Sequence, residues 1–232
     1  SELKELQATH SLIPSGVEKH IYERGKEPTT DVVVLDTSTP WSKPTTTTSD
    51  VLALLATGRF TLNHNYNGIY VLVRAEDSAS NVAPPTLHFP LLESLAFSKT
   101  GTLIEDPQAH FGMSRKAHEQ DDGKGFLTYG PYLDLPPGRH KVTFRYQVND
   151  STNQPAIKLE VTSNGGQKIL SEHLVSEDTP EDIWSEKDLF FTAGPQGVQQ
   201  TEFRIYYFGN GNVNVDTPTL ALTPTENVYP SE

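Results

Sequence analysis

Aromatic side chains offer the clearest chemistry in this sequence. They concentrate in the last third of the chain, at Trp184, Phe190, Phe191, Phe203, Tyr206, Tyr207 and Phe208. Side chains alternate along an extended strand, so within "FRIYYF" Phe203, Ile205 and Tyr207 share one face. Tyr206 and Phe208 share the other face, which needs either a covering segment or a ligand. Sugars are one such ligand, because their C–H faces stack on aromatic rings.

Two tyrosines and two asparagines extend this set. In "GFLTYGPYLDLPPGRHKVTFRYQ", Tyr129 and Tyr132 flank a Gly-Pro step, and proline has no N–H to donate to a strand ladder. The step predicts a bulge or a sheet edge that re-aims one side chain. The candidate carbohydrate-binding residues are Tyr129, Tyr132, Trp184, Tyr206, Phe208, Asn210 and Asn212. The alternative, half-buried packing of the same rings against other parts of the chain, stays open.

Known catalytic motifs are absent from the sequence. It contains no phosphate-binding loop, dinucleotide fingerprint, Gly-x-Ser-x-Gly elbow or HExxH pair. We therefore expect no catalytic residue and no independent enzyme activity. Asp36 ends a predicted strand, where it either holds a cation or a hydroxyl, or caps the following turn "DTSTPW".

Composition narrows the classes of partner. The 232 residues carry a formal net charge of −12, with 18 basic and 30 acidic side chains. This excess of acid excludes a nucleic-acid partner, because binding to phosphates requires clustered positive charge. The chain has no cysteine, which excludes disulfides and thiol chemistry.

Residues 1–75 predict a small α/β layer. "SELKELQATHSL" has the spacing of a short helix, and the continuous run "TDVVVLDTS" reads as a strand buried on both faces. A second helix follows in "TTTTSDVLALLATGRF", with Ser49 as N-cap and Gly58 as the stop. Asn67-Gly68 between alternating runs predicts a β-hairpin.

The remainder of the chain changes character. Residues 76–92 are polar and proline-rich, which predicts a linker. Residues 93–232 lose the helical period and show short alternating runs separated by Asn, Gly, Pro and Asp clusters. That pattern predicts an antiparallel β-sandwich or jelly roll. The expected fold class is therefore α+β overall: a small N-terminal α/β layer followed by a C-terminal jelly-roll sandwich.

Two family resemblances accompany these patterns. "GPYLDLPPGRHKVTFRYQ", "LEVTSNGG" and "GNVNVDTPTLAL" resemble jelly-roll modules of the carbohydrate-binding type, over about residues 95–222. Residues 11–14, 32–36 and 58–73 resemble the extracytoplasmic tail of an uncharacterised polytopic membrane protein family. That family is related to the glycosyltransferases that use lipid-linked sugars, and Ser15 stands where it commonly has a histidine.

The resemblances imply partners and a location. The chain would be an outward-facing, cell-surface portion of a membrane glycosyltransferase-like protein, with its membrane segments upstream of residue 1. Its partner would be a cell-envelope glycan or a lipid-linked sugar. The alternative is a structural or interaction domain of a cell-surface assembly that binds no sugar.

A calcium site is a further implication of the jelly-roll resemblance. Such sugar binders commonly hold Ca²⁺ between the first and last strands, and calcium takes six to eight oxygen ligands. Glu105, Asp106 and Asp216 are the candidates to converge there. The alternative is that they are solvated surface acids in an acidic chain.

Overall fold

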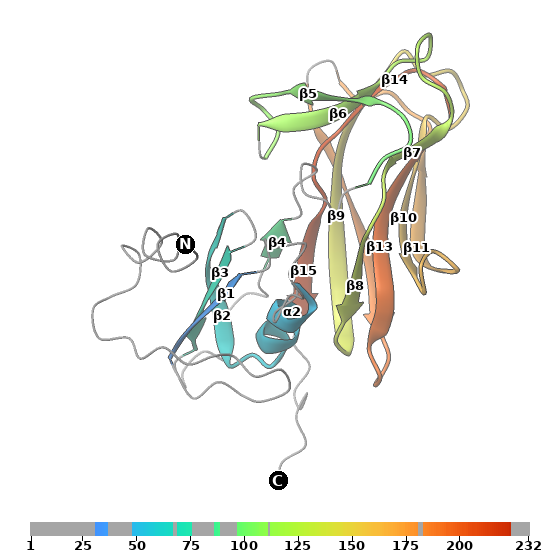
Figure 1. Cartoon of the computed structure of the whole chain (residues 1–232). Coiled ribbons are helices and arrows are strands. Elements are labelled where there is room, and N and C mark those ends of the chain that lie inside the picture. Colours follow the sequence, from blue (N-terminus) through green and yellow to red (C-terminus); the bar gives the residue numbers. More distant parts are fainter. Residues whose placement is uncertain are drawn as a thin grey trace.

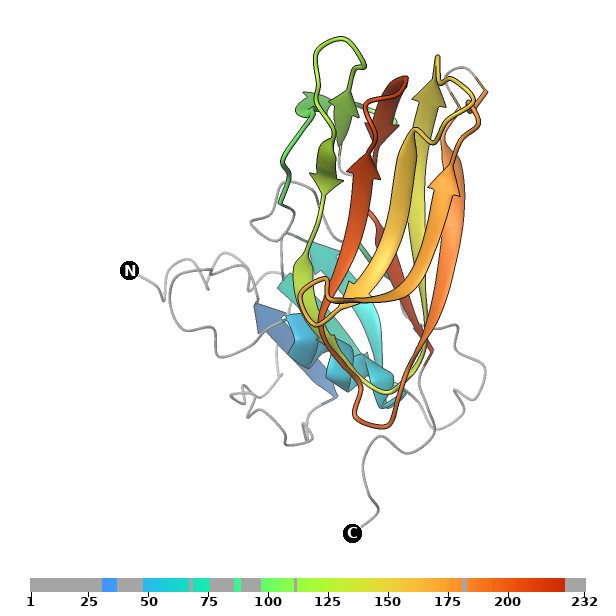
Figure 2. The ribbon, with the colours of Figure 1, turned by 90° about the vertical axis from the view of Figure 1, so that its right-hand side faces the viewer.

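The C-terminal part of the protein is a sandwich of two antiparallel β-sheets. The computed structural model describes residues 31–36, 48–66, 69–75, 86–88, 97–110, 112–180 and 183–223. Figure 1 shows the two sheets packed face to face, and Figure 2 turns one of them toward the viewer. The described part of residues 125–223 contains strands and no helix, so the predicted β-sandwich is confirmed.

The five-stranded sheet has the order β11-β10-β13-β7, with β8 also paired to β13. Its strands are β7 (Gly125–Thr128), β8 (Pro131–Leu135), β10 (Ile157–Ser163), β11 (Lys168–Val175) and β13 (Val198–Tyr207). Strands β7 and β8 follow one another along the same edge of β13. The sheet therefore ends in an edge that breaks between Thr128 and Pro131, as the Gly-Pro step predicts.

The seven-stranded sheet is built around β9 (Gly138–Asn149). One side of β9 pairs with β12 (Ser185–Ala193), and the other pairs with β15 (Thr219–Thr223) and β14 (Asn212–Val215). The outer strands are β4 (Thr86–His88), β6 (Met113–Ala117) and β5 (Thr102–Glu105).

The turn "LPPGRH" joins strands of different sheets. Strand β8 belongs to the five-stranded sheet and β9 to the seven-stranded one. The turn therefore crosses between the sheets. The alternation of apolar and polar residues on each side of the turn would be the same if β8 and β9 paired with each other, so the sequence alone does not predict the crossing.

The core lies between the sheets, where alternation delivers one face of each strand. Phe203, Ile205 and Tyr207 of β13 are buried there, as predicted. Phe144 of β9 and Leu159 of β10 are fully buried as well. Burial of aliphatic and aromatic side chains of this size stabilises the fold by roughly 1.5 to 3 kcal/mol each.

The described residues of the N-terminal region form a three-stranded antiparallel sheet and one helix. The sheet has the order β1 (Val32–Asp36), β3 (Ile69–Arg74) and β2 (Phe60–Tyr66). The pairing Tyr66↔Ile69 fits the predicted hairpin. The predicted helix in residues 1–12 lies outside the described residues, so the α/β layer is not confirmed, and the boundaries at 75 and 92 stay predictions.

Strand β1 corrects the prediction of burial on both faces. Val33 and Leu35 are buried, but Val34 is 42% exposed. Among the described strands β1 pairs with β3 alone, and Val34 lies on a face that is open to solvent there. A run of β-branched residues thus lies at a sheet edge. The role of Asp36, which ends β1, stays open between the two readings.

Helix α2 (Thr48–Ala56) packs between the small sheet and the sandwich, as Figure 1 shows. Its apolar residues are buried all round because β2 lies on one side and β8 and β15 on the other. Ser49 is not the N-cap: it lies inside the helix, and its hydroxyl accepts a hydrogen bond from the backbone N–H of Asp134 at 2.9 Å. Gly58 follows the helix with φ +69°, which confirms it as the stop.

Candidate functional site

The outer face of the five-stranded sheet gathers aromatic and charged side chains. On β13 and β10 the inner positions are apolar, whereas the outer positions pair Lys158 with Tyr206, Glu160 with Arg204 and Thr162 with Glu202. Figure 2 shows the sheet that carries this face. The alternation that builds the core therefore also presents a row of functional groups to the outside.

Six rings form a continuous ladder at the edge of this face. Neighbouring ring centroids lie 5.2 to 6.0 Å apart. We call this set the aromatic ladder; its members are Phe208, Tyr206, Phe126, Tyr129, Phe97 and Tyr132. Tyr206 meets both Phe126 and Phe208 edge to face, a favoured geometry for aromatic pairs.

The local backbone explains how the far end of the ladder is placed. Phe97 and Tyr129 exchange two backbone hydrogen bonds, of 3.1 and 2.9 Å, which attach a distant segment to the sheet edge. Gly130 (φ +98°) and Tyr132 (φ +65°) both have left-handed backbones. Tyr132 is consequently turned outward and is 41% exposed, beside Phe97 at 42%.

A buried charge network supports the ladder from beneath. The carboxylate of Glu160 is almost fully buried and accepts hydrogen bonds from Arg204 Nε (3.0 Å) and Nη2 (2.7 Å). Lys158 Nζ binds the other carboxylate oxygen. The Arg204 guanidinium also lies over the Phe126 ring, 5.1 Å from its centroid. The network therefore fixes the central ring of the ladder.

Glu202 links the network to the outermost ring. Its side chain is buried, and the Tyr132 hydroxyl donates a hydrogen bond to it. Burial raises the pKa of the Glu202 carboxyl, although Arg204 and the Tyr132 hydrogen bond act in the opposite direction. Burial, followed by the nearby charge of Glu202, raises the pKa of Tyr132. Tyr132 is therefore a hydrogen-bond donor throughout the neutral pH range.

A glycine allows the turn between β10 and β11 to pack closely against this network. The turn between β10 and β11 brings Gly166 over Arg204 and Glu202, with φ +86°. A Cβ built on Gly166 would lie 3.1 Å from a Glu202 carboxylate oxygen and closer still to the Arg204 guanidinium. Any side chain at this position would push the network apart.

The seven predicted sugar-binding residues separate into groups. Tyr129, Tyr132, Tyr206 and Phe208 meet in the aromatic ladder. Trp184 lies instead on the outer face of the other sheet, where the Arg145 guanidinium stacks 4.6 Å from its ring. Sugar binding by any of these residues stays a prediction.

The two asparagines also leave the ladder. Asn210 is buried; it accepts hydrogen bonds from the backbone N–H and the hydroxyl of Thr152, and donates to the carbonyl of Gln154. Asn212 lines a pocket on the seven-stranded sheet. Asn210 thus ties a loop in place, and Asn212 belongs to a different surface.

Sequence reasoning missed two ladder residues. Phe126 was available from alternation, because it lies opposite Tyr206 on the outer face. Phe97 had no local signal, since its place depends on the bridge to Tyr129.

The predicted calcium ligands do not form one cluster. Asp216 is fully buried and binds Arg145 Nη1 at 2.6 Å and two backbone N–H groups. Asp106 accepts hydrogen bonds from Ser114, from the side chain of Asn214 and from a backbone N–H. Among the described residues, no group of three His, Asp or Glu side chains could hold a metal ion. Calcium binding remains an untested prediction.

Comparison with known proteins gives distant structural likenesses. No family model and no curated protein sequence matches this chain. Solved structures that match include a CBM6 module of a laminarinase from Zobellia galactanivorans, at 13% identity and TM-score 0.41, covering 59% of this chain and 98% of that one. A CBM35 module from Cellvibrio japonicus matches at 15% identity and TM-score 0.43, covering 61% and 98%.

A cleaved adhesin domain of Lys-gingipain from Porphyromonas gingivalis matches at 14% identity and TM-score 0.43, covering 60% and 98%. These values are too low to carry a function from those proteins to this chain. Within the described part of the chain, no helix has the length and apolar character needed to cross a membrane.

Proposed function

We propose that this chain is a non-catalytic glycan-binding module and that the aromatic ladder is its sugar-binding surface. The observation that carries the proposal is the ladder itself: six rings in sequence, with hydrogen-bonding groups beside them. Rings supply stacking surface for the C–H faces of sugars. Lys158, which pairs with Tyr206 in the strand register, and the Tyr132 hydroxyl supply polar groups for sugar hydroxyls. A series of six neighbouring rings, of which Phe97 and Tyr132 are 42% and 41% exposed, suits several units of a polymer better than one isolated sugar.

The network beneath the ladder supports this proposal. A binding surface works best when its side chains are held in place before the ligand arrives, because less conformational freedom is then lost on binding. Arg204 fixes Phe126 from below, and Glu202 orients the Tyr132 hydroxyl. The buried charges therefore serve as positioning groups.

The test is binding to a panel of soluble polysaccharides, namely laminarin, xylan, mannan and chitohexaose, measured by titration calorimetry. We expect at least one to bind, and Tyr132→Ala to weaken that binding at least tenfold. Phe190→Ala is the matched control, because Phe190 is 60% exposed on the opposite sheet. Equal loss of binding in both variants would contradict the ladder as the sugar surface.

A finer proposal concerns the cellular context. We infer from the resemblance of residues 11–14, 32–36 and 58–73 that the module belongs to the outward-facing part of a membrane glycosyltransferase-like protein. There it would bind a cell-envelope glycan or a lipid-linked sugar. A coding sequence upstream of residue 1 that specifies several apolar segments of about 20 residues supports this context. An upstream sequence without such segments contradicts it.

A second candidate function is that of an interaction domain in a cell-surface assembly. The exposed Ile169 and Leu174 on edge strand β11 favour it, because unpaired edges with apolar side chains invite pairing with another chain. Ile169→Asp with Leu174→Asp separates the two functions. Sugar binding should survive this change if the ladder is the site, whereas self-association in sedimentation experiments should disappear if β11 is an interface.

A further inference from the structure

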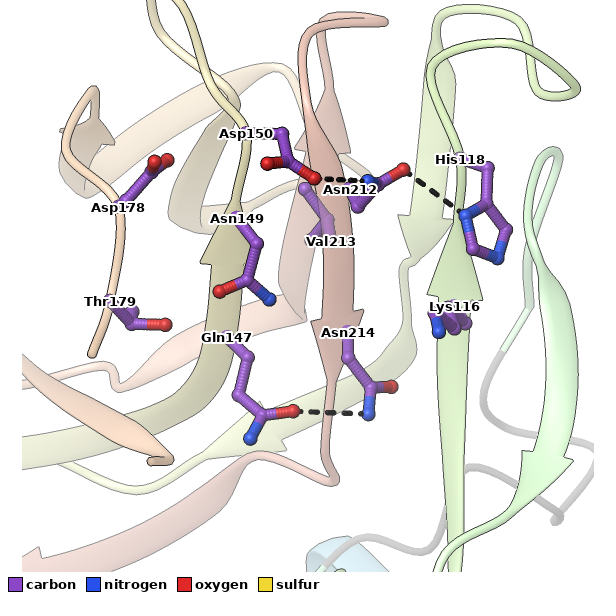
Figure 3. A pocket seen from close by; sticks show the side chains of 10 residues that line it. All are labelled: Lys116, His118, Gln147, Asn149, Asp150, Asp178, Thr179, Asn212, Val213 and Asn214. Atoms are coloured by element: carbon purple, nitrogen blue, oxygen red, sulfur yellow. Dashed lines mark hydrogen bonds between the residues drawn. The ribbon is translucent and has the colours of Figure 1, made fainter. Parts of the chain in front are cut away.

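A polar pocket lies on the outer face of the seven-stranded sheet, on the opposite side of the sandwich from the ladder. Its floor comes from adjacent strands: Gln147 and Asn149 from β9, and Asn212 and Asn214 from β14. Figure 3 shows these side chains between Asp178 and Thr179 on one side and Lys116 and His118 on the other. The pocket has a volume of about 560 Å³, within the usual range for small-ligand sites.

The walls of the pocket are held by the main chain. Thr179 exchanges hydrogen bonds with the backbone of Val148, its own N–H donating to the Val148 carbonyl at 2.7 Å and its hydroxyl accepting at 3.1 Å. Asp178 accepts a hydrogen bond from the backbone N–H of Ser151 at 2.9 Å. Its hydrogen bonds with Ser151 lower the pKa of the Asp178 carboxyl, so this wall carries a negative charge at neutral pH.

Hydrogen bonding fixes the orientation of Asn212 and the tautomer of His118. The Asn212 amide nitrogen donates to Asp150 at 2.9 Å, so its oxygen faces Nδ1 of His118 at 3.1 Å. An amide oxygen can only accept, so His118 Nδ1 carries the proton of this hydrogen bond. The other ring nitrogen of the neutral imidazole, Nε2, is then an acceptor.

Asn214 and Gln147 leave unused hydrogen-bonding capacity at the floor. The Asn214 amide nitrogen donates to Asp106 at 3.1 Å and to Gln147 at 3.4 Å. Its oxygen is buried and has no partner among the described residues. Because the Gln147 oxygen accepts from Asn214, the Gln147 nitrogen remains as a donor. A buried acceptor without a partner destabilises the fold, and a donor at this position would relieve that cost.

We propose that this pocket is a second ligand site, independent of the ladder, that binds a hydroxyl-rich ring compound of mono- or disaccharide size. Each hydroxyl both donates and accepts, which matches a lining of mixed donors and acceptors. Lys116 stands against Asp150 and Asp178, so the lining has no single sign of charge that would select a phosphate or a polyamine. Among the described residues that line the pocket there is no Phe, Tyr or Trp, and the His118 imidazole is the one ring, which disfavours large flat heterocycles that bind by stacking.

The test is a titration of the ¹⁵N-labelled chain with the methyl glycosides of glucose, galactose, mannose and xylose. Binding is monitored through the amide chemical shifts. We expect saturable shifts for residues 147–150 and 212–214 with at least one glycoside. Asn149→Ala and Asp178→Asn, two changes at the pocket wall and floor, should each raise Kd at least tenfold. Phe190→Ala is the matched control: Phe190 is 60% exposed and does not line the pocket, so this change should leave Kd unchanged.

Several results would overturn the proposal. Saturable shifts confined to residues 125–132 and 202–208 would assign monosaccharide binding to the ladder instead. The absence of saturable shifts with all four glycosides would remove the site, whether or not polysaccharides bind elsewhere. Repeating the titration with chitohexaose distinguishes binding of a free monosaccharide from binding of an oligosaccharide. Shifts at the pocket with chitohexaose, but with none of the four glycosides, would contradict a site of mono- or disaccharide size.

Discussion

The two outer faces of the sandwich carry the same supporting arrangement but differ in what lies around it. On the five-stranded sheet, Arg204 pairs with buried Glu160 and lies over Phe126. On the seven-stranded sheet, Arg145 pairs with buried Asp216 and lies over Trp184. Each face thus holds a carboxylate, an arginine and a ring in one stack.

The difference lies in the neighbours of the ring. Phe126 continues into the other rings of the ladder, whereas the strands beside Arg145 carry the amides Gln147 and Asn214. A ladder of rings favours stacking on a long ligand, and a pocket of amides favours hydrogen bonding to a small one. The sandwich thus supplies an arginine anchor on both sides, and the side chains around each anchor are what distinguish the two proposed sites.

The largest expected effect comes from removing either arginine. Arg204→Met and Arg145→Met each leave a buried carboxylate without its main partner, which typically costs about 3 to 5 kcal/mol of the free energy of unfolding. Each carboxylate keeps other partners, Lys158 for Glu160, and His110 Nδ1 with two backbone N–H groups for Asp216, so both losses should lie toward the lower end of this range. Urea unfolding measures both. Equal and negligible losses would show that neither carboxylate depends on its arginine.

A smaller effect is expected at Tyr206. Its ring is half-buried and contacts Phe126 and Phe208, so Tyr206→Ala should cost less than the roughly 3 to 5 kcal/mol of a fully buried ring. Tyr207→Phe is a useful companion, since it keeps the buried ring but removes the hydrogen bond from its hydroxyl to the Gly211 carbonyl. Thermal unfolding and polysaccharide binding are measured together. A loss at Tyr206 as large as that of a core ring, with sugar binding intact, would make this ring a packing residue.

The pH dependence of stability should report on Glu202. Burial raises the pKa of this carboxyl in the folded state above its ordinary value of 4.5. Stability from this group is therefore fully present below that ordinary value and is lost as pH rises through the raised pKa. Glu202→Gln should flatten this part of the stability profile measured by urea unfolding between pH 4 and pH 7. A profile for Glu202→Gln that parallels the wild type would show that Glu202 is not the group responsible.

The smallest effect is expected from chelation. The carboxylates of Asp106 and Asp216 already hold hydrogen bonds or an arginine, so removal of calcium should leave Tm unchanged. The measurement compares thermal unfolding in EDTA with unfolding in excess Ca²⁺. A Tm that falls in EDTA and returns with Ca²⁺ would restore the predicted calcium site by mass action.

Local patterns predict the strands of this fold better than they predict its surfaces. Alternation correctly places Phe203, Ile205 and Tyr207 in the core, because burial on one face is a property of the strand itself. The Gly-Pro step predicts that a side chain near it is re-aimed, but it does not predict that Tyr132 is the one. The left-handed backbone that turns Tyr132 outward is set by the tertiary fold. Phe97 joins the ladder through pairing with Tyr129, which no local pattern encodes.

Long-range pairing also explains the misplaced site residues. Trp184 and Tyr206 both belong to the aromatic-rich last third of the chain, but they lie on opposite faces of the sandwich because β12 and β13 join different sheets. Asp216 was a candidate metal ligand, and its partner Arg145 comes from a strand 71 residues away in sequence. Sequence spacing cannot reveal either relation without the strand order.

The most direct measurement of the central claim is an amide chemical-shift titration of the ¹⁵N-labelled chain with laminarin, xylan, mannan and chitohexaose. The account predicts saturable shifts for residues 125–132 and 202–208 with at least one of them, and their loss in a Tyr132→Ala, Tyr206→Ala double variant that remains folded. Saturable shifts that persist unchanged in the double variant, or binding of none of the four, would contradict the aromatic ladder as a glycan-binding surface.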